Sequence, residues 1–181
     1  MSLGADLERA QYPIGRFVFP TEATGAADRA HAIEVLERTP AVFRSLVEPL
    51  SDAVLDTPYR SGGWTIRQVV HHVPESHMNM YIRMKLALTE DTPTIKPYDE
   101  DRWARLADAR SPVGTSLDLL DALHRRWVTF LRTLSEADFL RTYRHPDLGI
   151  VALYQGLAMY AWHGEHHAAH VRAALQRTAS R

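Results

Sequence analysis

Four segments of the chain repeat apolar residues at intervals of three and four, and stretches rich in proline and glycine separate them. That spacing places apolar side chains on one face of a helix. We therefore predict four main antiparallel helices near residues 27–50, 65–89, 113–134 and 151–176, without a substantial sheet. Because each helix has one apolar face to bury, the expected fold class is all-α.

Local signals refine the ends and the regularity of these helices. Thr65 is followed three residues later by Gln68, the pattern of a capping box, so the second helix should start at Thr65. Thr39-Pro40 predicts a kink or short break in the first helix, and Pro74 predicts a local bend in the second. Ser111-Pro112 is expected to cap the third helix.

The segments between the helices are expected to be irregular. Prolines and glycines in residues 1–26 predict an extended N-terminal arm laid on the surface. Residues 135–139 should form a short helical turn, and residues 143–149 a loop. The acidic residues within 98–103 are interpreted as a solvated face, with a lid over a pocket as the alternative.

Composition narrows the class of protein. With 181 residues, the chain can form one domain, residues 1–181, with a proper core. Its net charge of −1 argues against nucleic-acid binding, and the absence of cysteine excludes disulfides and thiolate metal sites. The chain has no apolar run of about 18 residues and no signal-peptide pattern, so we expect no membrane span and a cytoplasmic location.

Histidines are the candidates for chemistry, because four of the ten fall within eight residues near the C-terminus. Residues four apart share a helix face, so His163/His167 or His166/His170 could bind one metal ion. A helix turns by about 100° per residue, which places His167 at the edge of the apolar face and His163 just beyond. His166 should face solvent, and His170 should lie farther out than His163. We therefore favour His163 and His167.

A third ligand is expected from the second helix. His72 lies on the flank of that helix's apolar face, whereas His77 lies in its middle and His71 faces out. In a bundle, the edges of adjacent apolar faces meet around one pocket, so His72 is the best candidate. The alternatives are a site that uses His77 or His170 instead of one of the three, or surface or core-edge histidines that bind no metal. His124, beside the third apolar face, is expected to be structural.

Several stretches together resemble the DinB/YfiT-like family, and more narrowly its YfiT-type metal-dependent hydrolases. The resemblance implies an up-down-down-up four-helix bundle, usually dimeric, with a three-histidine metal site at His72, His163 and His167. Pro74 departs from the family pattern and bears on the geometry around His72. The matching stretches are Tyr12 to Gly15, Leu55 to Arg60, Gly63 to His72, Ser76 to Asn79, Tyr81 to Arg83, Pro97 to Glu100, His145-Pro146, Trp162-His163 and His166-His167.

Three neutral imidazoles would leave a divalent ion, with zinc or nickel expected, at least one open position, as in catalytic zinc sites. Such a zinc centre lowers the pKa of bound water to about 7, which suits hydrolysis of an ester or amide. The alternatives are a metal-dependent S-transferase that uses a low-molecular-weight thiol, and a non-catalytic metal-binding stress-response protein. The expected partners are a small-molecule substrate and a second copy in a homodimer. Glu75, His77 and Glu165 are available as a general base, but no catalytic residue is singled out.

Overall fold

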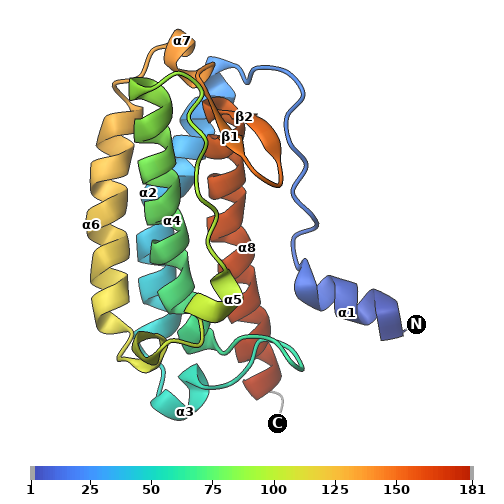
Figure 1. The fold of residues 1–181 in the computed structure, drawn as a ribbon. Helices are drawn as coiled ribbons and strands as arrows, with labels where there is room; N and C mark the ends of the chain where they lie inside the picture. The colour runs from blue at the N-terminus through green and yellow to red at the C-terminus, as the bar shows by residue number, and fades with distance from the viewer. Residues whose placement is uncertain (1–2, 180–181) are drawn as a thin grey trace.

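The computed structural model describes residues 3–179, and side chains within residues 7–178. Four long helices form a bundle, with short helices and one hairpin at its ends and along its side (Figure 1). The elements are α1 (Leu3–Gln11), α2 (Ala26–Val47), α3 (Asp52–Leu55), α4 (Ile66–Thr89), α5 (Glu100–Trp103), a 3₁₀ helix (Ala107–Arg110), α6 (Gly114–Leu131), α7 (Glu136–Phe139), β1 (Thr142–His145), β2 (Gly149–Ala152) and α8 (Leu153–Ala179).

The bundle has the up-down-down-up order that the family resemblance implied. α2 and α8 run in one direction, and α4 and α6 run in the other (Figure 1). Two consecutive helices, α4 and α6, are parallel because residues 90–113 return along the side of the bundle before α6 begins. The four helices are therefore not all antiparallel to their neighbours: α2 packs against α8 and α6, and α4 packs against the same two helices.

The predicted capping box is present at the start of α4. The hydroxyl oxygen of Thr65 accepts a hydrogen bond from the Gln68 amide at 3.1 Å, and the Gln68 side chain accepts one from the Thr65 amide at 2.9 Å. Of the kink or short break expected at Thr39-Pro40, the break is wrong, because α2 continues through Pro40; α4 likewise continues through Pro74. Both prolines are buried, so packing holds the helices across the missing backbone donors. Ser111 does not cap α6, which begins at Gly114.

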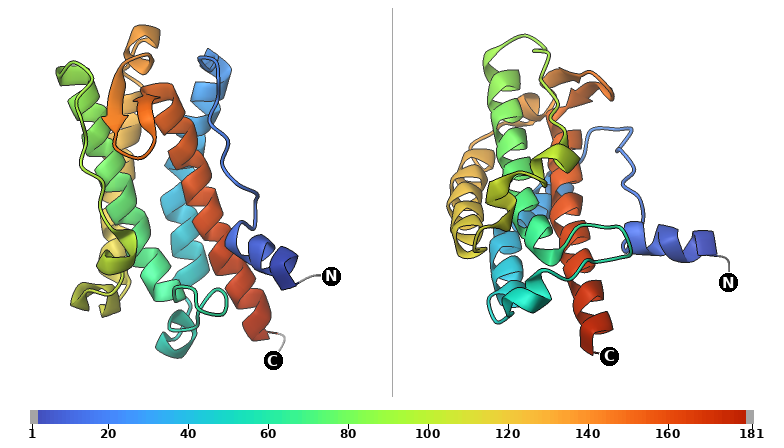
Figure 2. Two further views of the ribbon diagram at one scale, coloured as in Figure 1. Left: turned by 45° about the vertical axis from the view of Figure 1, so that its right-hand side comes forward. Right: turned by 60° about the horizontal axis from the view of Figure 1, so that its bottom comes forward.

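Only part of the N-terminal arm is extended. Residues 1–2 lie outside the described part, and α1 occupies residues for which an extended conformation was expected. The prolines of this segment all lie beyond Gln11, so they do not oppose the helix. Residues 12–25 run along α8 (Figure 2). The Gln155 side chain donates to the Pro20 carbonyl at 2.9 Å, and the Phe17 ring lies 5.7 Å from the Trp162 ring.

The loop expected at residues 143–149 is an antiparallel hairpin, β1–β2. Tyr143 pairs with Val151, and both side chains are buried on the face that covers the top of the core. The turn at residues 146–148 leads into Gly149, the first residue of β2, whose φ of 76° suits glycine. Residues 135–139 contain the expected helical turn, α7.

The core has two apolar clusters along the bundle. One surrounds Leu36, Met84, Trp127 and Leu157, and the other surrounds Phe43, Val70 and Val171. Residues of the two clusters flank several histidines along the helices, namely His77 of α4, His124 of α6, and His163, His166 and His167 of α8. Among the described residues, no helix is long and apolar enough to cross a membrane.

Candidate metal centre

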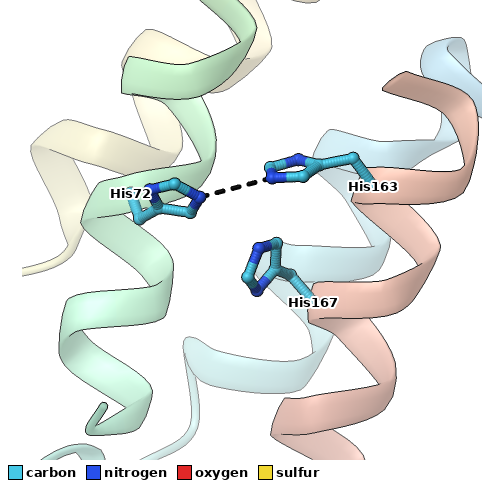
Figure 3. Close-up of side chains that lie close together, drawn as sticks. All are labelled: His72, His163 and His167. Carbon is cyan, nitrogen blue, oxygen red and sulfur yellow. Dashed lines mark hydrogen bonds between the residues drawn. The ribbon is translucent and has the colours of Figure 1, made fainter. Parts of the chain in front are cut away.

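Three histidines from two helices converge between α4 and α8. His72 projects from α4 toward α8, and His163 and His167 project from successive turns of α8 toward α4 (Figure 3). The Nε2 atoms of His72 and His163 are 3.3 Å apart, and one nitrogen from each of the three residues lies within 4.8 Å of the other two. The structure therefore brings together the three residues that the sequence selected.

The spacing of these nitrogens fits a metal ion. Zinc binds imidazole nitrogen at about 2.0–2.1 Å, and two ligands at a tetrahedral angle are then about 3.3–3.4 Å apart. The separation of 3.3 Å between the His72 and His163 nitrogens matches that edge. The other separations within the cluster are at most 4.8 Å, about 1.4 Å longer than that edge.

The three imidazoles are held in the neutral form that a metal requires. Burial lowers the pKa of His72 to about 4. Burial, and then the nearness of other histidines, lowers the pKa of His163 and of His167 well below the ordinary value. Each ring therefore has a free nitrogen lone pair at neutral pH.

A chain of hydrogen bonds orients His163. His163 Nδ1 lies 3.1 Å from His77 Nε2, His77 Nδ1 lies 2.9 Å from His124 Nε2, and His124 Nδ1 lies 2.6 Å from the Leu36 carbonyl oxygen. A carbonyl can only accept, so His124 donates from Nδ1. Its Nε2 then accepts from His77 Nδ1, and His77 Nε2 accepts from His163 Nδ1. The proton of His163 is thereby placed on Nδ1, and its Nε2 lone pair faces His72.

A second chain orients His167 in the same way. His170 Nε2 lies 3.0 Å from the Gln11 carbonyl oxygen, so His170 donates from Nε2 and accepts at Nδ1. His167 Nδ1 lies 3.5 Å from that acceptor, a long hydrogen bond. This arrangement leaves His167 Nε2 for a metal. His77 and His170, the two rivals for the site, thus lie behind the three ligands, in the place where supporting hydrogen bonds orient metal ligands.

A cavity of about 880 Å³ opens beside the three histidines. The Trp64 ring borders it and lies 4.8 Å from the His72 ring and 6.5 Å from the His167 ring. The Trp64 indole donates to Asp101 at 2.9 Å, so the segment that crosses in front of the bundle is tied to the cavity wall. Pro97, Tyr98 and Glu100 also line the cavity. The acidic segment therefore borders the site, as the lid alternative required.

Two histidines expected to face solvent are buried, and helix phase was wrong about them. His71 is 7% exposed because Ser111 and Ser116 cover it, and it contacts the Ser116 hydroxyl at 2.7 Å. His166 is also 7% exposed, because it lies against the rings of Trp162 and Tyr12. His124 has the structural position expected of it, since it is buried and bonded to the Leu36 carbonyl. The covering residues come from remote segments, which the periodicity of a single helix does not report.

None of the three residues considered as a general base lines the cavity. Glu165 is exposed and lines a separate hollow between α2 and α8. Glu75 is half-buried and lies outside the lining, and burial raises its pKa. His77 is committed to the hydrogen-bond chain. The carboxylates that do line the cavity are Glu100 and Asp101, which were interpreted as part of a solvated face, and Asp147, which lies in the segment predicted to be a loop.

Comparison with known proteins gives consistent matches. The DinB superfamily model matches residues 35–171. Two proteins named "Putative metal-dependent hydrolase", from Oceanobacillus iheyensis and Bacillus cereus, are each 48% identical over 167 residues, which cover 92% of this chain and 96% of each relative. The structure of YfiT from Bacillus subtilis, described as a probable metal-dependent hydrolase with an unusual four-helix bundle topology, matches with a TM-score of 0.92 and 47% identity, over 94% of this chain and 98% of that one.

Proposed function

The chain belongs to the DinB superfamily, and from that premise we propose that it is a metal-dependent hydrolase in which His72, His163 and His167 hold one divalent ion. The observation that supports this most strongly is the convergence of three neutral imidazoles on one point beside a cavity. Zinc and nickel are the proposed metals, because imidazole binds both well. The names of the relatives describe the same activity.

The bound ion would supply Lewis acidity toward water and toward the carbonyl oxygen of an ester or amide. Three neutral ligands leave the full charge of the ion in place, and no fourth histidine belongs to the cluster among the described residues. The hydrogen-bond chains that end at the Leu36 and Gln11 carbonyls hold two of the ligands in the correct tautomer. These two ligands are therefore already oriented in the metal-free protein.

Other cavity residues would bind and enclose the substrate. Trp64 and Tyr98 provide aromatic walls. The Ser76 hydroxyl donates to the Tyr160 hydroxyl at 3.3 Å, so a polar pair faces the same space. A small molecule bound there would have both apolar and hydrogen-bonding contacts, which is typical of small-molecule sites.

The test is a metal titration of His72→Ala, His163→Ala and His167→Ala against His31→Ala. His31 is exposed on α2 and is a better control than the buried His71 or His166. Each of the first three should lose metal affinity steeply, and His31→Ala should keep it. Wild-type affinity in all three folded variants would refute the assignment.

Turnover is tested separately, with ester and amide substrates in the presence and absence of a chelator. Hydrolysis that disappears with the metal and returns on its addition supports a hydrolase. Product formation that requires an added low-molecular-weight thiol would identify an S-transferase instead. If the protein binds metal but catalyses neither reaction, a non-catalytic metal-binding role replaces the proposed activity.

The assembly that we propose is a homodimer. The N-terminal segment exposes large apolar side chains, with Leu7 48%, Ile14 44% and Val18 82% exposed. Burial of such a row against a second copy would be favourable. Light scattering at micromolar concentration should give twice the chain mass of 20.5 kDa, and a value near that single mass would contradict the proposal.

A further inference from the structure

A buried arginine lies in the same cavity as the histidine cluster. Arg83 is on α4, eleven residues after His72, and eleven steps of about 100° return it to nearly the same face of the helix. Its side chain is only 9% exposed, and it lines the cavity together with His145 and Tyr160. The cavity therefore has a histidine cluster toward one end of α4 and a guanidinium toward the other.

Arg83 has no counter-ion within the part of the chain that the structure describes. No carboxylate there lies within ion-pair distance of it, and no side chain or carbonyl makes a hydrogen bond with it. The other buried arginine, Arg67, is 7% exposed and differs sharply, since it donates to Asp56 and Asp52, each at 2.7 Å. A buried cation is normally paired, so the isolation of Arg83 requires an explanation.

The groups around Arg83 do not neutralise it. Burial lowers the pKa of His145, and the positive charge of Arg83 lowers it further. Burial raises the pKa of Tyr160, so this neighbour carries no negative charge at neutral pH. The nearest acid on the hairpin, Asp147, contacts His145 at 3.8 Å and leaves the guanidinium unpaired. A negative group that enters the cavity would therefore meet an unneutralised cation with five N–H donors.

We propose that Arg83 binds an oxyanion, a carboxylate or phosphate, on the substrate of the histidine site. A planar guanidinium can donate two parallel hydrogen bonds to either group. The Cα atoms of Arg83 and His72 are about 16 Å apart along α4, and a long side chain on a helix reaches back toward the N-terminus. The anion and the reacting bond should therefore be on the order of 10 Å apart, which favours a small anionic ester or amide.

The assignment of this anion to a substrate rests on the proposed function, but anion binding can be measured without it. We would titrate metal-free protein with three probes that share one ring: benzoate, phenyl phosphate and benzamide. Isothermal titration calorimetry should show at least one of the anions binding about tenfold or more tightly than neutral benzamide, as expected for a charge-assisted hydrogen bond. Equal affinity for all three probes would overturn the proposal.

Variants locate the bound anion. Arg83→Gln should remove the preference for the anions and leave benzamide binding unchanged. Arg105→Gln, at an exposed arginine of the same cavity, and Arg125→Gln, at an exposed arginine on α6, should keep it. A preference that persists in Arg83→Gln, or that disappears in Arg105→Gln, would contradict the assignment.

Two further measurements keep the result interpretable. If Arg83→Gln does not fold, Arg83→Lys can be used instead, because it retains the charge without the planar pair of donors. Arg83→Lys should lower the affinity for the preferred anion by about threefold or more, while the affinity for benzamide stays constant. Unchanged anion affinity in Arg83→Lys would then count against the proposal. Because all titrations use metal-free protein, a failure of metal binding or turnover would not alter their outcome.

Discussion

His77 should control metal affinity although it is not a proposed ligand. It is fully buried and lies between His163 Nδ1, at 3.1 Å, and His124 Nε2, at 2.9 Å. His77→Leu removes both hydrogen bonds and leaves two polar groups without partners. At about 1–3 kcal/mol for each, the free energy of unfolding should fall by about 2–6 kcal/mol. Loss of a supporting hydrogen bond typically lowers metal affinity by about 10–100-fold, or about 1.4–2.7 kcal/mol.

The assay is a Co²⁺ titration followed by visible absorption, with each variant kept well below its unfolding temperature. His124→Leu is the matched control, because it breaks the same chain one link farther from the site. It leaves the Leu36 carbonyl and His77 Nδ1 without partners, so its stability loss should be similar. The bond between His77 and His163 remains, so its metal affinity should stay within about threefold of the wild type.

The two variants separate ligand orientation from general destabilisation. If His77→Leu binds Co²⁺ with wild-type affinity and spectrum while folded, the hydrogen-bond chain does not orient His163. If His77→Leu and His124→Leu lose metal affinity equally, the loss follows stability rather than the hydrogen bond to the ligand. Either result would refute the role given to His77.

Three further outcomes can be measured by urea unfolding. Leu36→Ala, at a side chain with no exposed surface, should cost about 2–5 kcal/mol, and a loss below about 1 kcal/mol would contradict its place in the core. Thr65→Ala should cost about 1 kcal/mol by breaking the capping box with Gln68, and no loss would mean that the cap is dispensable. A hydrogen bond from Arg67 lowers the pKa of Asp56 below its ordinary value of 3.8. The stability that this pair contributes is therefore present above pH 3.8 and is lost as the pH falls through the lower pKa of the folded state. On acidification, wild type should lose more stability than Asp56→Asn, and equal losses would show that the pair contributes nothing.

Local patterns along the chain were sufficient to predict the main helices and the start of α4. Apolar periodicity and the capping box depend on residues within a few positions of each other, so they act before any tertiary contact forms. The same short-range periodicity placed His72, His163 and His167 at the edges of apolar faces. The family resemblance selected the same residues. It also implied the order of the helices, and the fold confirms that order. That these residues bind metal stays a prediction.

Contacts between remote segments determine which polar groups are covered and which are paired. His166 and His170 are buried because residues 11 and 12 lie over α8, and His71 is buried because Ser111 and Ser116 close over it. The β1–β2 hairpin likewise depends on the burial of Tyr143 and Val151 against the bundle. These contacts join segments tens of residues apart, so periodicity along one helix carries no information about them.

The unpaired state of Arg83 is the clearest case of a property that only the fold could decide. Arg67 and Arg83 are both arginines of α4. Arg67 forms ion pairs with two aspartates, whereas Arg83 forms none with any carboxylate among the described residues. Whether a charge has a partner depends on how remote loops approach it in space, and the free-energy cost of burial depends on that partner. The helix pattern singled out neither arginine, and packing alone made one of them available to a ligand.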